Sequence, residues 1–369
     1  MSAHSVQAPT PPFFSWILSG ESPKVFFLFL LPLTVILLFG YKLSSFNTTD
    51  LSPEFSIIDA AKQKEFGEFT VKVKTGLYLK NFTKFDVLNN QFIFDALLWF
   101  EYHSNEIMLE NIGKFSVDNG KVINKSSPDI RVFDDVVVAT YDIRIDCKAN
   151  LDFEKFPFED HKLSIVITNN AVTPYEMFFI VDNTTFNVAP DLNISNWKIK
   201  SLNTDSGYFS PAVDTKSADK GSAYPKAIFT LNVQKTGIRK VLVIFLPIYL
   251  VMMLSLFSFL MAIGNYVGRF SLASAGISAE LGYRFVLDKM IPEVSYFTTA
   301  DSLYLVLLVS SFLVFISQLF IGRYCSLYVD TVLPVEKMER VAFVEKINGV
   351  CFYLILFLVL TATCFLVIR

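Results

Sequence analysis

The sequence predicts an α+β membrane protein. An extracellular or periplasmic antiparallel β-sandwich is followed by a four-helix transmembrane bundle and preceded by an N-terminal hydrophobic anchor helix. Two observations carry this prediction. Hydrophobic residues make up 52% of the 369 residues, more than in an average soluble protein, and several runs carry no charge over the length of a membrane span. Between the first two of these runs, short segments alternate apolar and polar residues, which is typical of strands.

Composition and motifs exclude several classes of protein. The net charge of −3 offers no basic surface for nucleic acid. The three histidines are scattered, without cysteine partners at metal-ligand spacing, and no nucleotide-binding loop or nucleophile motif occurs. We therefore expect no metal, no cofactor and no enzymatic activity. Cys147 is the one cysteine away from the apolar spans, so we expect no disulfide within the predicted sandwich.

The N-terminal region contains the first uncharged run. Residues 1–24 form a Pro- and Ser-rich tail, and residues 25–41 carry no charge over 17 positions. This run fits either the core of a signal peptide or a short membrane anchor. We favour a retained anchor, because the preceding segment is long and no small-residue cleavage site follows. Residues 42–68 are interpreted as a linker.

Residues 69–237 are predicted to form the β-sandwich, which would be the ligand-binding domain. Residues 71–79 alternate Val, Val, Thr and Leu with Lys, Lys, Gly and Tyr, as in a half-buried strand. Asn89 and Asn90 separate two such runs and predict a hairpin turn. Further strand-like segments follow, and no long helical pattern interrupts them. The longest turn-rich connection is 207–224, and loops of that length are often functional.

The region 238–369 is predicted to be a four-helix transmembrane domain. Its spans are expected at residues 239–263, 269–289, 299–322 and 346–368. The short connector 323–346 is mildly rich in Lys and Arg, which indicates a cytoplasmic position. The sandwich and the C-terminus would then lie outside, and with the first anchor retained the N-terminus would lie inside.

The second span is half polar. On a helix, its small and polar residues fall on one stripe together with one phenylalanine: Ser271, Ala275, Ser278, Gly282, Phe285 and Lys289. Glu280 lies opposite this stripe, and we expect it to pair with Arg284 four residues on. Such a stripe suits the wall of a water-filled pore, and it equally suits a buried helix whose small residues permit close packing.

Two stretches of the sequence resemble motifs of a known family. Residues 151–163, LDFEKFPFEDHKL, resemble the signature loop of the pentameric ligand-gated ion channels, the Cys-loop receptor superfamily, with Glu159 at the usual Asp position. Residues 291–301, IPEVSYFTTAD, are similar to that family's linker between the second and third spans. Pro247 falls where the family's first span carries a proline. The resemblance covers residues 69–368.

The departures from the family are also informative. Ala149 and Leu163 stand at the positions of the two bridging cysteines, as in the bacterial branch, which lacks the bridge. The resemblance implies a bacterial-type homopentamer in the lipid bilayer of the cell (inner) membrane. There, binding of an unknown small-molecule ligand or of protons would open a pore for inorganic ions. The alternative is a non-conducting membrane receptor or scaffold on the same fold.

The resemblance also implies site residues. Candidates for an aromatic ligand pocket are Trp99, Tyr102, Tyr175, Tyr208 and Tyr224. Each of them could equally be a core or rim residue. Candidates for coupling the sandwich to the helices are Asp86, Phe156, Pro157, Phe158, Glu159, Asp160, Lys235 and Pro292. The acids among them could pair with Lys235 or Lys289, and the alternative for Phe156 and Phe158 is that they cap the bottom of the sandwich.

Fixed charge along the predicted pore is positive or neutral. Arg269 lies at the inner end of the stripe and Lys289 at the outer end, which predicts weak anion preference or poor discrimination. Alternatively, Arg269 extends into the interface and contributes little. Ser278 occupies the middle of the stripe, so Phe285 is the residue that could form an apolar constriction.

Overall fold

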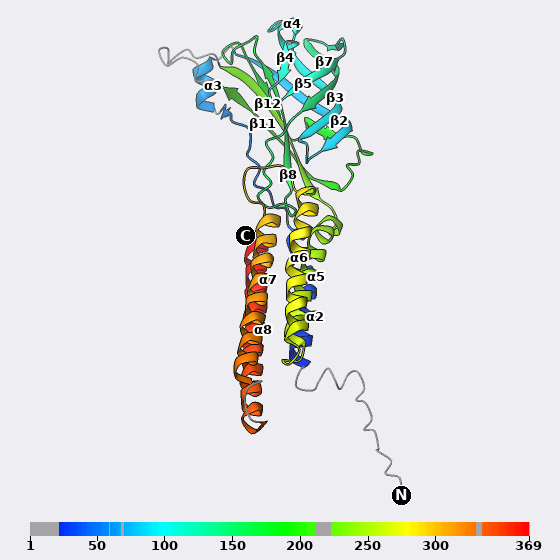
Figure 1. The fold of residues 1–369 in the computed structure, drawn as a ribbon. Coiled ribbons are helices and arrows are strands. Elements are labelled where there is room, and N and C mark those ends of the chain that lie inside the picture. Colours follow the sequence, from blue (N-terminus) through cyan, green and yellow to red (C-terminus); the bar gives the residue numbers. More distant parts are fainter. Residues whose placement is uncertain (1–21, 59, 68–69, 211–222, 330–333, 369) are drawn as a thin grey trace. The chain divides into compact units, whose positions relative to one another are not determined.

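A computed structural model describes residues 22–58, 60–67, 70–210, 223–329 and 334–368. These residues separate into two units (Figure 1). The sheet unit holds residues 46–153 and 159–236, and the helical unit holds the described part of residues 1–45 with 154–158 and 237–368. Three predicted features lie wholly or mostly outside the described residues: the tail 1–24, the first sandwich residue Phe69, and the connection 207–224.

Two sheets build the sheet unit. The first has the order β1 (Ser56–Ile57), β11 (Trp197–Phe209), β12 (Tyr224–Lys235), β8 (His161–Asn169), β4 (Phe115–Val117). The second has the order β10 (Phe186–Val188), β2 (Val71–Asp86), β3 (Gln91–His103), β7 (Val136–Cys147), β5 (Gly120–Lys125). In addition, β6 (Asp129–Phe133) pairs with β7, and β9 (Met177–Ile180) pairs with β2. Two short helices, α3 (Ala60–Phe66) and α4 (Leu109–Ile112), complete the unit.

The core of the sheet unit follows from the alternation read in the sequence. Every second residue of β3 is buried from Phe92 to Tyr102, which places one face of the strand in the core. Aromatic rings then join the two sheets. Phe100 of β3 lies 5.5 Å from Phe115 of β4, and Phe186 of β10 lies 5.5 Å from Phe229 of β12. The two sheets therefore form a sandwich-like arrangement with an aromatic core.

Strand direction departs from the prediction in one place. The long strands are antiparallel, and Asn90 adopts a positive φ of 50° in the β2–β3 hairpin, which confirms the turn predicted at Asn89–Asn90. However, the short strands β9 and β10 both pair in parallel with β2, so the antiparallel prediction is wrong for them. The alternation of apolar residues determines which face of a strand is buried but not the direction of its partner. No local signal therefore distinguishes parallel from antiparallel pairing.

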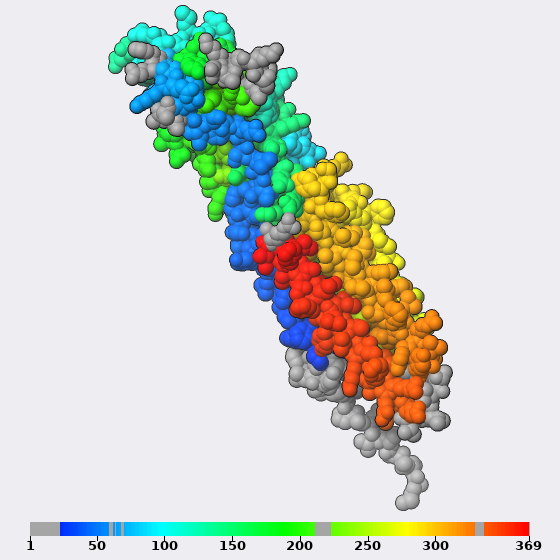
Figure 2. Space-filling model, turned by 90° about the vertical axis from the view of Figure 1, so that its left-hand side faces the viewer, coloured from blue at the N-terminus to red at the C-terminus, as the bar shows by residue number. Residues whose placement is uncertain are grey.

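Five long helices build the helical unit: α2 (Ser22–Ser44), α5 (Arg239–Phe257), α6 (Tyr266–Asp288), α7 (Thr299–Tyr324) and α8 (Pro334–Ile368). Within the described residues, all of these except α6 are long and apolar enough to cross a membrane. In α6, serines, glycines and charged residues lower the hydropathy. Figure 2 shows α8 on one face of this unit between α2 and α7, and it packs against both.

The region predicted as a short connector, 323–346, is largely helical. The last turns of α7 continue as a π-helical segment, η2 (Cys325–Val329), and α8 begins at Pro334, before the predicted span at residue 346. Charges four residues apart support this early start, since Arg340 lies 3.8 Å from Glu336. Hydropathy marks only the apolar part of such a helix, so the sequence placed its beginning too late.

Helices α5 and α6 meet closely. A Cβ on Gly276 would lie 1.8 Å from Ser255 Oγ, so only glycine permits this approach. Pro247 has no N–H to donate to the carbonyl of Val243, four residues earlier in α5. The Tyr283 hydroxyl of α6 donates there instead, at 3.1 Å to Val243 O and 2.9 Å to Ile244 O. The proline in α5 thus creates an acceptor that α6 satisfies.

We predict that Tyr283→Phe destabilises the helical unit by about 1–3 kcal/mol, because the Val243 and Ile244 carbonyls lose the donor that the hydroxyl supplies. Thermal unfolding of the full chain in detergent measures the effect as a lower midpoint. Tyr353→Phe is the matched control, since no hydrogen bond of the Tyr353 hydroxyl is seen among the described residues. Equal midpoints for the Tyr283 variant and the wild type would contradict the prediction.

Candidate functional site

The loop that carries the FPF motif supplies acceptors to the start of helix α7. The first N–H groups of any helix lack partners inside it. Here Thr299 N donates to Glu154 O at 2.8 Å, and Ala300 N donates to Phe156 O at 3.1 Å. Thr298 and Asp301 complete the cap, since each side chain accepts from the backbone N–H of the other residue. Residues 154–158 therefore belong structurally to the helical unit.

The two phenylalanines of this motif are buried among the helices. The Phe158 ring stacks on Phe245 of α5 with centroids 5.7 Å apart and lies 5.2 Å from Phe39 of α2. Lys240 places its ammonium 5.0 Å from the Phe156 ring. Packing in the helical unit thus fixes Phe156 and Phe158.

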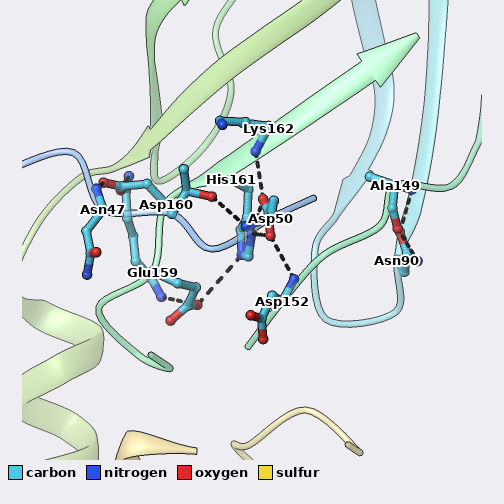
Figure 3. A network of polar contacts seen from close by, with 11 residues as sticks. Asn47, Asp50, Asn90, Ala149, Asp152, Glu159, Asp160, His161 and Lys162 are labelled. Carbon is cyan, nitrogen blue, oxygen red and sulfur yellow. Dashed lines mark hydrogen bonds and ion pairs between the residues drawn. The ribbon is translucent and has the colours of Figure 1, made fainter. Parts of the chain in front are cut away.

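A buried carboxylate organises the loop's second half, in the sheet unit (Figure 3). We call residues 46–58 the strap; they belong to the segment interpreted as a linker, which also contains β1 and α3. Asp50 of the strap accepts hydrogen bonds from Asp152 N at 2.7 Å and Lys162 N at 2.8 Å, and lies 3.0 Å from His161 Nδ1. The side chains of Asp50 and His161 are almost fully buried. One carboxylate thus fixes both ends of residues 152–162.

A second acid repeats this pattern beside the first. Asp160 accepts from Asn47 N of the strap and from Lys235 N of β12, both at 2.8 Å. Its own N–H donates to Asn47 O at 2.7 Å, so strap and loop are bonded in both directions. Burial raises the pKa of the Asp160 carboxyl, and the two backbone N–H groups oppose this shift. Because the folded-state pKa is raised, the contribution of this group to stability falls as pH rises through that pKa.

Glu159 completes the cluster. Its carboxylate lies 3.2 Å from Lys235 Nζ and 3.8 Å from His161 Nε2, and all three side chains are buried. The pairing of Glu159 with Lys235 is therefore confirmed. Asp86 instead accepts from Asn89 N and Nδ2 in the β2–β3 hairpin, and these bonds lower the pKa of Asp86. Asn90 ties the same hairpin to Ala149 by two hydrogen bonds, of 2.8 and 2.9 Å.

The candidate aromatic residues lie apart, with one exception. Tyr102 is buried in the core of β3, Trp99 lies half-exposed over Gly76 of β2, and Tyr224 begins β12. Tyr175 and Tyr208 come together through Phe66 of α3, whose ring contacts them edge-on at 5.1 and 5.2 Å.

The same helix also places a cation at this cluster. The ammonium of Lys62 lies 5.7 Å from the Phe66 ring and 6.0 Å from the Tyr208 ring. Residues of α3 therefore occupy the space between the two candidate tyrosines. Phe66 and Lys62 were not expected from the sequence, because α3 lies in the segment interpreted as a linker.

Helix α6 has two contrasting faces. The predicted pore residues are all exposed in the single chain: Ser271, Ala275, Ser278, Gly282, Phe285 and Lys289. Phe285 is the most exposed of the large apolar residues of α6, with 75% of its surface exposed. The opposite face is buried against α5 and α7: Arg269, Ala273, Gly276, Glu280 and Leu287. The pattern read as a stripe thus lies on the side of α6 that contacts neither helix.

Two charge predictions for α6 are wrong. Glu280 is fully buried and accepts a hydrogen bond from Ser311 of α7 at 2.8 Å, while Arg284 pairs with Asp288 and Asp301. Arg269 is 1% exposed and donates to Gln318 of α7 and Asn348 of α8. Its charge therefore does not lie on the predicted pore face. Helical spacing could have shown this, since Arg269 and Glu280, eleven residues apart, share one face.

Two further observations concern metal ligands and Cys147. Within the part of the chain that the structure describes, no group of three His, Cys, Asp or Glu residues is placed to hold a metal ion. Cys147 is buried without a disulfide, and burial raises the pKa of its thiol to about 12. No protein-family model and no curated protein matches this chain. A functional assignment therefore rests on its own residues and geometry.

We predict that Asp50→Asn loosens the strap, because the neutral amide accepts more weakly than a carboxylate and its NH₂ group faces N–H donors. Hydrogen exchange at the amides of Asp152 and Lys162 should accelerate about 10- to 100-fold. Glu54→Gln, an exposed change four residues along the strap, is the control and should leave both amides unchanged. Unaltered protection in the Asp50 variant would remove this carboxylate from its organising role.

Proposed function

We propose that this protein is a pentameric ligand-gated ion channel of the bacterial type, with α6 lining the pore. The exposed face of α6 supports the proposal most directly. The exposed side of α6 carries serine, alanine and glycine beside larger apolar residues such as Leu281 and Val286. The small residues suit a water-filled path, because they tolerate water where a lipid-facing surface would be apolar throughout. Five copies related by a closed rotation would place these faces around one axis.

The four apolar helices and the sheet unit fit a multi-pass protein of the cell (inner) membrane. The proposal places the sheet unit outside, where a small-molecule ligand or protons would act, and inorganic ions would pass through the pore. Such a ligand shifts the closed–open equilibrium only as far as its affinities for the two states differ. Phe285, exposed near one end of α6, is the candidate for a constriction that closes the pore by excluding water.

The loop of residues 154–160 is the proposed coupling element. Its first part caps α7 through two backbone carbonyls, and its second part is bonded to the strap and β12. A shift of β12 would thus reach the loop through Asp160 and Lys235, and the loop would carry it to the first turn of α7. Asp86, Pro157 and Pro292 are retained in this role as proposals.

A second candidate is a non-conducting receptor or scaffold on the same fold. The aromatic cluster favours this alternative, because Phe66 and Lys62 occupy the space between Tyr175 and Tyr208 where a cationic ligand of a gated channel would sit. Purified protein in planar bilayers distinguishes the two. Absence of current under any ligand or pH, despite a verified pentamer, supports the scaffold.

The pore assignment is tested by cysteine accessibility. We predict that a charged thiol reagent alters the current of Ser278→Cys, because this position lies on the exposed face of α6. Ala273→Cys lies on the buried face and should not respond, and the wild type controls for the native cysteines. A response at position 273 but not at 278 would place the pore elsewhere.

Arg269 is buried on the opposite face of α6, so Lys289 is the charged residue among those on the proposed pore face. We therefore predict poor discrimination with a slight anion preference in the wild type. Lys289→Glu should move the reversal potential in a KCl gradient toward the potassium equilibrium potential, since a ring of five positive charges becomes negative. Lys148→Glu, exposed in the sheet unit, is the control. A wild-type reversal potential already near that of potassium contradicts the prediction.

A further inference from the structure

A cavity lies between the strap and the first sheet, apart from the aromatic candidates. It measures about 370 Å³, which is within the range of small-molecule sites. Leu51 to Glu54 of the strap form one wall, and Lys162, Ser164 and Val166 of β8 form another. These three residues alternate along β8, so their side chains point to the same side of the sheet.

The charges around this cavity are not all satisfied. Lys226 of β12 is buried, forms an ion pair with Asp118, and lies 4.2 Å from the Phe209 ring, so its charge is compensated. Lys162 has no acceptor for its ammonium among the described residues, although its backbone N–H is bonded to Asp50. One cation therefore lines the cavity without a counter-charge at hydrogen-bond distance.

Unused acceptors lie on the same walls. The side-chain amide of Asn119 donates to Lys148 O at 2.6 Å and to Ser164 O at 2.9 Å. Its carbonyl oxygen Oδ1 is buried without a donor among the described residues. A buried acceptor without a donor is destabilising unless something supplies one. Asn119 bonds the backbone of Ser164, two positions along β8 from Lys162. Glu54 adds an exposed carboxylate to this side.

We propose that this cavity binds a small carboxylate that carries a hydrogen-bond donor beside its acid group. Lys162 would bind the carboxylate, and a ligand hydroxyl or ammonium group would donate to the Glu54 carboxylate on the wall that the strap forms. The ligand fits because it supplies a counter-charge for Lys162 and a donor for Glu54. The site does not depend on ion conduction, and it can be tested even if the chain forms no pore.

Binding at this site would also act on the strap. Leu51 to Glu54 directly follow Asp50, and Lys162 holds Asp50 through its backbone while its side chain lines the cavity. A bound carboxylate would therefore contact β8 and the strap together. We expect it to increase the hydrogen-exchange protection of the amides of Leu51, Ser52 and Glu54, which line the cavity.

The test uses the full chain in detergent and three probes of similar size: lactate, alanine and isopropylamine. Lactate and alanine share the carboxylate and differ in the donor, hydroxyl or ammonium, whereas isopropylamine has no carboxylate. Ligand-observed NMR should show saturable millimolar binding of lactate or alanine, and the stronger of the two identifies the donor. Lys162→Gln should weaken the binding of that carboxylate about tenfold or more. Lys162→Arg should retain this binding, and Lys148→Gln should leave it unchanged.

Three results would overturn the proposal. The first is no saturable binding of either carboxylate to the wild type, and the second is equal binding to the Lys162→Gln variant. The third is binding of isopropylamine as strong as that of the carboxylates. A Lys162→Gln variant that fails to fold would show changed circular dichroism, and the Lys162→Arg variant then decides, because loss of binding with the charge retained contradicts the proposal.

Discussion

The geometry of the loop of residues 152–162 depends on one constraint, the buried Asp50 carboxylate. Its two oxygens meet two backbone N–H groups and a histidine ring, from residues more than 100 positions away in the chain. A carboxylate buried in this way would be strongly destabilising without its donors. The donors are in turn fixed in space by it, so the strap, the loop and the start of β8 take one arrangement together.

Local patterns predicted much of the fold. Alternation identified the long strands, uncharged runs identified the apolar helices, and the residues of the predicted α6 stripe are exposed in the single chain. The roles of Asp50 and His161 could not be predicted from the sequence, because they depend on a contact between distant parts of the chain. No pattern within a few residues of Asp50 distinguishes it from a solvated acid. For the same reason the segment around it was interpreted as a linker.

The buried charges of α6 show what sets the rotation of that helix. Glu280 bonds Ser311 and Arg269 bonds Gln318, and the two partners lie seven residues, or two turns, apart on α7. A rotation of α6 about its axis would leave both charges without partners in an apolar region. Helix α7 therefore determines which residues of α6 remain open, whatever those residues then face.

Among the described residues, β11 lies at the edge of the first sheet except where the short strand β1 pairs with it, and this affects how copies of this protein can associate. Its end at Gly207 and Tyr208 is covered by β1, and a Cβ on Gly207 would lie 2.3 Å from Ser56 O, so glycine is needed there. Further along, a bulge between Ile199 and Ser201 breaks the ladder, and Lys198 and Lys200 are exposed. Lysines, bulges and short covering strands all oppose the addition of another strand. Assembly through this edge must therefore use side chains, and not a sheet continued from one chain into the next.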